Sequence, residues 1–130
     1  MKKFTLMFLA TCFAMTTAQA DPIYGIWQTI GDDNGNYGHI EVQDCEGSIC
    51  GVLVKSFNST GKQIESPNVG KKIIWDMQAK GDGKYGGGQL WAPDRDKTYS
   101  SKLTLVGDNL TVTGCVLIFC RDGGVWIRAN

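Results

Sequence analysis

Residues 25–27 read Gly-Ile-Trp, residues 126–128 read Trp-Ile-Arg, and these two segments decide the fold. The first lies in the earliest β-rich run of the chain, and the second ends the last such run. In a closed barrel the first and last strands are neighbours, so the Arg128 guanidinium would lie across the Trp27 indole. This cation–π contact would contribute roughly 0.5–2 kcal/mol and close one end of the barrel. The residues predicted to close it are Gly25, Trp27, Trp126 and Arg128.

Short β-rich runs, each bounded by turn residues, fill the sequence between these two segments. In one of them Ile40 and Val42 alternate with polar residues, which is typical of a half-buried strand. Strands at this spacing favour a sandwich or a barrel, and hairpin-length connections favour an up-and-down order. Eight antiparallel strands can close and so remove both exposed edges. We therefore expect an all-β, eight-stranded antiparallel up-and-down barrel, with strands near 24–30, 38–45, 50–57, 72–78, 85–91, 98–106, 110–114 and 125–128.

Composition excludes several classes of protein. The 130 residues carry 13 basic and 13 acidic side chains, whereas a nucleic-acid-binding protein should carry a basic surplus. A single histidine rules out a metal site built from several histidines. A literal Gly81-x-Gly83-x-x-Gly86 match to the dinucleotide fingerprint has no helix after it to face a pyrophosphate. We expect no cofactor and no metal.

The first twenty residues have the pattern of a secretory signal peptide. Lys2 and Lys3 precede an apolar run over 4–15, and Ala18-Gln19-Ala20 has the small residues of a cleavage site. The run is shorter than the roughly 20 residues of a membrane span, so no transmembrane anchor is expected. A lipoprotein signal with Cys12 is the rival interpretation, and Thr11 argues against it. We expect cleavage near Ala20 and a single exported β-barrel domain over 21–130.

Four cysteines, Cys45, Cys50, Cys115 and Cys120, remain in that domain, and an even count on an exported chain indicates disulfides. A turn at 46–49 would make Cys45 and Cys50 cross-strand neighbours, so this pair is favoured. The same spacing suggests a pair between Cys115 and Cys120, while crossed pairings between the two motifs remain open. Zinc binding is disfavoured because no histidine flanks the cysteines.

The apolar segment 116–119 (Val-Leu-Ile-Phe) is ambiguous. If it caps a hairpin, four apolar side chains lie at the barrel rim, where they would mark a membrane or partner contact. If it forms a strand or bulge, these side chains are buried against the core. Because they are poor turn material, we favour burial.

A longer pattern resembles a known family. Cys45-x4-Cys50-Gly51, Tyr85-Gly-Gly-Gly88, Pro93 before Lys97-Thr98-Tyr99, Leu110-x-Val112-x-Gly114-Cys115 and the closing Trp-x-Arg occur in that order. Together they are similar to a family of small exported bacterial proteins described as a domain of unknown function, over nearly all of 22–128. The Gly-x-Trp segment with a C-terminal arginine also resembles the lipocalin signature. The chain departs from the family in a shorter 58–71 segment and in Asp94-Arg95-Asp96, which lacks an expected glycine.

This resemblance implies a lipocalin-like barrel in the periplasm or outside the cell, and binding of a small apolar molecule. We expect a non-catalytic protein that binds a hydrophobic or amphipathic ligand in the barrel, although a barrel interior filled by side chains is the alternative. Tyr99 is the expected polar contact. The predicted cavity-wall residues are Trp75, Met77, Trp91, Tyr99 and Leu103.

Two further functions stay open. An envelope protein-interaction or inhibitor module would act through rim loops, either 58–71 or 116–119. A hydrolase would need carboxylates from Asp76, Asp82, Asp94 and Asp96 to converge. His39 faces outward by its phase and no nucleophile elbow is present, so we expect no enzymatic activity.

Overall fold

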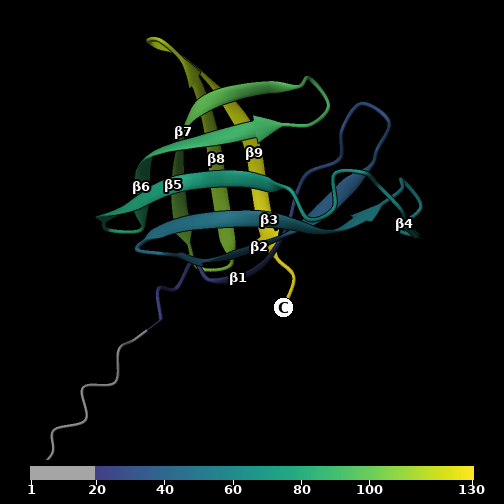
Figure 1. Cartoon of the computed structure of the whole chain (residues 1–130), viewed down its shortest axis with the longest axis horizontal. Helices are drawn as coiled ribbons and strands as arrows, with labels where there is room; N and C mark the ends of the chain where they lie inside the picture. The colour runs from purple at the N-terminus through teal and green to yellow at the C-terminus, as the bar shows by residue number, and fades with distance from the viewer. Residues whose placement is uncertain (1–19) are drawn as a thin grey trace, which may run out of the picture.

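The computed structural model describes residues 20–130, and the predicted signal peptide lies outside the described residues except for Ala20. This part of the chain forms strands and no helix, so no helix in it is long and apolar enough to cross a membrane. Figure 1 shows the arrangement of the strands. They are β1 (Gly25–Gln28), β2 (Tyr37–Cys45), β3 (Ser48–Phe57), β4 (Gln63–Ile64), β5 (Lys72–Gly81), β6 (Lys84–Ala92), β7 (Lys97–Val106), β8 (Asn109–Val116) and β9 (Phe119–Arg128).

Eight of these strands close into a ring. The hydrogen-bonded order is β2-β1-β9-β8-β7-β6-β5-β3, and a further pairing between β2 and β3 joins the two ends of that order. Every pairing is antiparallel, and Trp27 on β1 pairs with Arg128 on β9. The two-residue β4 attaches only to the end of β3. The predicted eight-stranded antiparallel barrel is therefore confirmed.

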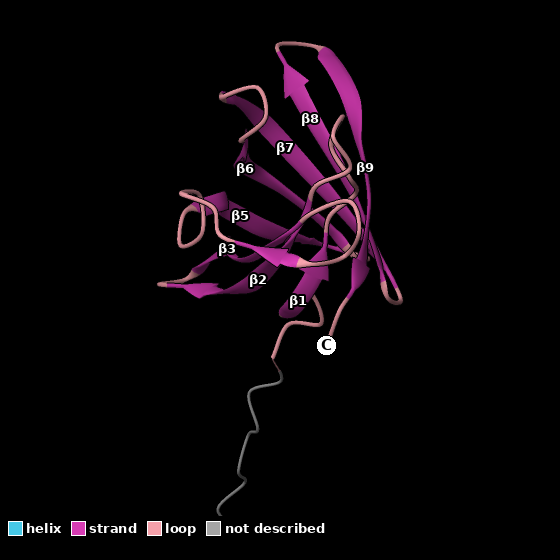
Figure 2. Ribbon diagram, turned by 90° about the vertical axis from the view of Figure 1, so that its right-hand side faces the viewer, coloured by secondary structure: helices cyan, strands magenta, loops and turns pink. Residues whose placement is uncertain are grey.

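The connections define two ends of the barrel. Turns at 46–47, 82–83 and 107–108 lie at one end, together with residues 21–24, and we call this the sealed end. The connections 29–36, 58–71, 93–96 and 117–118 lie at the other, which we call the open end. In Figures 1 and 2 the β8–β9 hairpin rises at the top beyond the other connections. The two longest loops, 29–36 and 58–71, therefore lie at the open end.

The core occupies the barrel interior. Ile23 from the N-terminal segment inserts into it, and Trp27 is fully buried. The inward-facing residues of the strands supply the rest. The buried cluster comprises Ile23, Trp27, Ile40, Val42, Ile49, Leu53, Ile73, Ile74, Met77, Tyr85, Leu103, Leu110, Val112 and Trp126.

Trp75 and Met77, two of the predicted cavity-wall residues, do not share a face of β5. Ile73, Ile74 and Met77 are buried, but Trp75 is only half-buried and pairs with the exposed Gln89. The period of two breaks at Asp76, which has a φ of 54°. Gly88 makes this irregularity possible, because a Cβ there would lie 2.5 Å from the Trp75 carbonyl oxygen.

The favoured burial of segment 116–119 is also wrong. Val116 pairs with Phe119 across a two-residue turn, so the segment caps the β8–β9 hairpin. The exposed fractions are 55% for Val116, 91% for Leu117, 88% for Ile118 and 74% for Phe119. Of the two interpretations of this segment, the one that places it at the barrel rim is correct.

Candidate ligand-binding cavity

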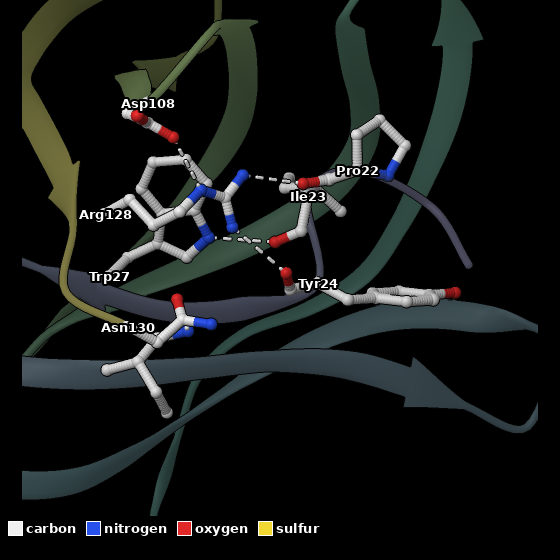
Figure 3. A network of polar contacts seen from close by, with 8 residues as sticks. Pro22, Ile23, Tyr24, Trp27, Asp108, Arg128 and Asn130 are labelled. Carbon is white, nitrogen blue, oxygen red and sulfur yellow. Dashed lines mark hydrogen bonds and ion pairs between the residues drawn. The ribbon is translucent and has the colours of Figure 1, made fainter. Parts of the chain in front are cut away.

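Arg128 closes the sealed end through four contacts of its guanidinium (Figure 3). The guanidinium carbon lies 4.3 Å from the centre of the Trp27 ring. Its nitrogens donate to the carbonyl oxygens of Pro22 (2.8 Å) and Tyr24 (3.2 Å) and to Asp108 Oδ1 (3.0 Å). Residues 22–24 therefore lie across this end, held by a side chain from the last strand.

Gly25 leaves the space that this arrangement needs. Its φ is +134°, and a Cβ there would lie 3.0 Å from Arg128 Nη1 and 2.9 Å from Asn130 Oδ1. Trp27 Nε1 donates to the Ile23 carbonyl oxygen at 2.8 Å, which satisfies the one polar atom of the buried indole. The glycine and the tryptophan of the Gly-x-Trp segment thus serve the same closure.

Tyr85 and Asp21 add a polar contact at the same end. The Tyr85 hydroxyl donates to Asp21 Oδ1 at 2.5 Å, and Asp21 Oδ1 also accepts from the Ile23 backbone N–H at 2.9 Å. Burial of the Tyr85 hydroxyl, together with its bond to Asp21 and the nearby negative charge, raises the Tyr85 pKa far above its usual 10. This phenol stays neutral at physiological pH and keeps donating to Asp21.

A cavity of about 690 Å³ opens at the opposite end of the barrel. Its apolar wall comes from residues that face the barrel interior, most of which also belong to the buried core cluster. Trp91 and Tyr99 extend this wall toward the mouth. The apolar residues that line it deeper in the barrel are Ile40, Leu53, Ile73, Leu90, Val112 and Trp126.

The mouth of the cavity is polar. It is formed by the loops 29–36, 58–71 and 93–96 and by the start of β9, and its charged residues are Asp32, Asp33, Asp94, Arg95, Arg121 and Asp122. Asp32 Oδ1 accepts from the backbone N–H groups of Asn34 and Asn36, each at 2.9 Å, so it fixes the turn of its own loop. Gly35 brings that loop against Ser59, since a Cβ at Gly35 would lie 2.7 Å from the Ser59 Cβ. The first and second loops therefore support each other at the mouth.

Two of the five predicted wall residues, Trp91 and Tyr99, line the cavity. Met77 and Leu103 are almost fully buried within the core and outside the cavity lining, so their inward phase leads to packing. Trp75 belongs to neither the core nor the cavity lining, because the left-handed conformation of Asp76 breaks the alternation of β5. The prediction missed the residues of the deeper wall, although the inward phase of residues such as Ile40 and Val112 was the signal that could have found them.

Trp91 and Tyr99 are each held in place by a neighbour. Trp91 Nε1 donates to Asp96 Oδ1 at 2.9 Å, and Lys71 Nζ lies 5.4 Å from the centre of the Trp91 ring. The Tyr99 ring packs over Gly114, where a Cβ would lie 3.2 Å from the Tyr99 Cβ. These contacts hold both aromatic rings at the boundary between the apolar wall and the polar mouth.

A second cavity of about 320 Å³ adjoins the β8–β9 hairpin. Tyr99, Gly114 and Arg121 line both cavities, as does Arg95. The remaining residues that line the smaller one are Lys97, Val116 and Phe119. Its lining therefore combines three basic side chains with apolar ones and contains no carboxylate.

The carboxylates considered for a hydrolase do not converge. Asp82 lies in the β5–β6 turn at the sealed end, whereas Asp94 and Asp96 lie in the β6–β7 turn at the open end. Between residues 20 and 130 no group of three or more potential metal-ligating side chains comes together. His39 packs on Phe57 with ring centres 4.6 Å apart, and its Nε2 lies 3.3 Å from Gln28 Oε1.

Each cysteine motif closes its own hairpin. Cys45 is bonded to Cys50 at the β2–β3 turn, with Cα atoms 5.8 Å apart, and Cys115 is bonded to Cys120 at the β8–β9 turn, with Cα atoms 4.0 Å apart. Cys115 and Cys120 are direct cross-strand partners, whereas Cys50 pairs with Gln43 and so lies diagonally from Cys45. One disulfide therefore lies at each end of the barrel.

Comparisons with known proteins agree with this architecture. A family model described as "Uncharacterized protein conserved in bacteria (DUF2147)" matches residues 25–128. Among solved structures, the chain is similar to protein HP1028 from the human pathogen Helicobacter pylori, described as belonging to the lipocalin family. The TM-score is 0.65 at 16% identity, and the match covers 85% of each chain, so the likeness is one of fold. A search of curated proteins found no match.

Proposed function

Because this chain belongs to the bacterial family DUF2147 and has a lipocalin-like fold, we propose that it binds a small hydrophobic or amphipathic molecule without transforming it. One observation carries the proposal. The barrel holds a cavity of about 690 Å³ with an apolar wall and a polar mouth, above an end that Arg128 and Trp27 close. Cavities that hold small ligands have volumes of about 300–1,000 Å³.

The chemistry of the wall favours a ligand with an apolar body. Leu90, Val112 and Trp126 offer surface whose burial against a ligand contributes about 25 cal/mol per Å². Trp91 and Tyr99 stand between this surface and the charged mouth, where the Tyr99 hydroxyl can meet a ligand head group. The cavity therefore suits a molecule that is apolar at one end and polar at the other.

Export belongs to the same proposal. Disulfides persist in oxidising compartments such as the bacterial periplasm, and the two disulfides are consistent with that location. The signal-peptide pattern of residues 1–20 points the same way, with cleavage before Asp21. Mass spectrometry of the protein recovered from the bacterial envelope should find an N-terminus at Asp21, and an uncleaved chain in the cytoplasm would contradict this location.

The experiment is a titration with a fluorescent fatty-acid analogue. Trp91→Ala and Tyr99→Ala should each weaken binding of the analogue about tenfold, since each removes contact surface at the mouth. Trp75→Ala is the matched control, because it deletes the same side chain as Trp91→Ala from a site outside the cavity. Equal loss in Trp75→Ala and Trp91→Ala, or saturable binding in none of the proteins, would refute the proposal. Native mass spectrometry of protein purified from its own envelope would identify the natural ligand.

A protein-interaction or inhibitor module is the second candidate, favoured by the exposure of segment 116–119 at the rim. It predicts the opposite pattern, in which Trp91→Ala and Tyr99→Ala leave capture of a partner intact and changes at 116–119 abolish it.

Catalysis makes a third prediction. An enzyme using Asp94 would chemically change a bound ligand and lose that turnover in Asp94→Asn, whereas we expect the ligand to be recovered unchanged from both proteins.

A further inference from the structure

The tip of the β8–β9 hairpin, residues 116–119, places four consecutive apolar side chains in solvent at the open end. Leu117 and Ile118, the two turn residues, are 91% and 88% exposed. Figure 2 shows the hairpin projecting beyond the rest of the barrel. A patch of exposed apolar side chains such as this one marks a site of contact with another protein or with a membrane.

The turn residues are unfavourable for the turn they form. Leu117 has a φ of 56°, in the left-handed region, where a bulky side chain is a genuine outlier. The β2–β3 turn also has a left-handed first residue and the same Cys-x4-Cys closure, but it uses Glu46 and Gly47. Since a two-residue turn with a glycine forms there under the same Cys-x4-Cys spacing, turn formation does not require Leu117-Ile118. Backbone strain held in this way points to a function for the side chains.

Basic side chains accompany the apolar tip. Arg95, Lys97 and Arg121 are exposed and line the smaller cavity together with Val116 and Phe119. The carboxylates closest in sequence, Asp94, Asp96 and Asp122, do not line that cavity. Asp96 accepts from Trp91 Nε1, and Asp94 lies 4.0 Å from Arg95 Nε across an exposed pair. An anionic group of about the size of a phosphate therefore finds positive charge directly beside the apolar tip.

The shape of the tip favours a bilayer over a protein. A stable protein interface buries about 800 Å² on each partner over about 20 residues. The tip is a convex two-stranded hairpin with four apolar residues, so a protein would need a narrow socket to cover it. Lipid chains accept any convex shape, and anionic headgroups attract basic residues next to it.

We propose that residues 116–119 insert into an anionic lipid bilayer while Arg95, Lys97 and Arg121 contact lipid phosphates. The Cys115–Cys120 disulfide holds the two strands together at the base of the tip, so the hairpin is formed before contact. Docking in this orientation brings the mouth of the larger cavity toward the membrane, because both lie at the open end. The inference goes beyond ligand binding and holds even for a barrel with no ligand.

Sedimentation with lipid vesicles tests this docking. The protein should bind vesicles of phosphatidylethanolamine with phosphatidylglycerol and bind pure phosphatidylcholine much more weakly. The double change Leu117→Asn with Ile118→Gly should lower the partition coefficient at least about tenfold, because it removes the apolar tip. Asparagine and glycine favour tight turns, so this variant keeps the hairpin folded. Arg121→Gln should weaken binding about fivefold at low salt, the effect of one basic residue at an anionic surface.

Val106→Asn provides the matched control. Val106 is 69% exposed and lies beside the turn at the sealed end, so its replacement should leave vesicle binding unchanged. In Ile118→Trp, the added tryptophan fluorescence should shift to the blue on anionic vesicles and be quenched by brominated lipid chains. Absence of vesicle binding, equal losses in Val106→Asn and the tip variant, or unquenched Ile118→Trp fluorescence would each overturn the proposal. So would concentration-dependent dimers that the tip variant abolishes, since the tip would then bind a second copy of the chain.

Discussion

The two ends of this barrel are built in opposite ways around the same ring of strands. At the sealed end, the guanidinium of Arg128 bonds to backbone oxygens of Pro22 and Tyr24 and stacks on the fully buried Trp27. At the open end, Arg121 is exposed and lines a cavity. The same residue type therefore holds the structure together at one end and faces solvent at the other. We therefore expect stability to be concentrated at the sealed end, which would leave the open end free for contacts with other molecules.

The two disulfide-bonded hairpins repeat this contrast on a smaller scale. Both have the spacing Cys-x4-Cys, a two-residue turn and a left-handed first turn residue. The sealed-end hairpin has Glu46 and Gly47 in its turn, whereas the open-end hairpin has Leu117 and Ile118. The disulfide lies diagonally in the first hairpin and joins direct cross-strand partners in the second. Since both disulfides close a two-residue turn, we expect the difference between the turn side chains to reflect what each tip contacts.

The largest expected effect comes from the indole at the sealed end. Trp27→Ala should lower the free energy of unfolding by about 3–5 kcal/mol, because it empties a fully buried site. Trp75→Ala, at a half-buried position outside the core, should cost much less. Urea denaturation followed by circular dichroism measures both. Similar losses in the two variants would mean that the sealed end is not the main source of stability.

A pair of arginine variants compares the ends directly. Arg128→Met should lower the free energy of unfolding by about 2–3 kcal/mol, since it removes charged hydrogen bonds to two carbonyl oxygens while keeping an apolar stem. Arg121→Met should change it by less than about 0.5 kcal/mol, as expected for an exposed side chain. The ion pair of Arg128 with the largely exposed Asp108 contributes little of the difference. The comparison fails if urea denaturation gives the same midpoint for both variants.

Exchanging the turn chemistry should change stability in opposite directions. Gly47→Leu should cost about 1 kcal/mol, because Gly47 has a φ of +95° and nothing lies near enough to its Cβ position to add a clash. Leu117→Gly should gain less than about 1 kcal/mol, because relief of the left-handed leucine is offset by the greater freedom of glycine in the unfolded chain. Thermal unfolding of the two variants checks the signs. A loss of stability in Leu117→Gly would show that the apolar tip packs on the barrel.

The smallest effect is a pH dependence near the open end. Burial, with a lesser effect of Lys55, lowers the pKa of His39 below its usual 6.5. The unfolded chain then binds a proton more readily than the folded one, so stability is complete above about pH 6.5 and falls as the pH is lowered. His39→Gln should remove this part of the loss between about pH 7 and pH 5. Urea denaturation midpoints at about pH 7 and pH 5 measure this effect. If the midpoint of His39→Gln falls with pH as much as that of the unmodified protein, His39 is not the cause of the loss.

Much of the fold could be predicted because local patterns and tertiary contacts agree. Alternating residues such as Ile40 and Val42 mark an inward face, and turn residues separate the strands. The Trp27–Arg128 contact could be predicted because closure of a barrel makes its first and last strands neighbours. The structure places these two side chains 4.3 Å apart.

The errors arose where backbone geometry or turn composition departs from the usual rule. Asp76 in a left-handed conformation shifts the phase within β5, and nothing in the alternation of Trp75 and Met77 signals that shift. Segment 116–119 lacks the polar residues and glycine by which turns are recognised. The depth of the cavity depends on how side chains from several strands fill the interior together, so periodicity within one strand could not separate Met77 in the core from Trp91 at the mouth.

The hydrogen bonds from Arg128 to Pro22 and Tyr24 span more than a hundred residues of sequence. A polypeptide emerges from a ribosome or a translocation pore with its N-terminus first. Residues 22–24 must therefore wait for more than a hundred later residues before they find their partner, and a chain that stops short of residue 128 has nothing to complete the ring. Folding of this domain consequently finishes only after residue 128 has been synthesised or transported, and products truncated before it should be readily degraded.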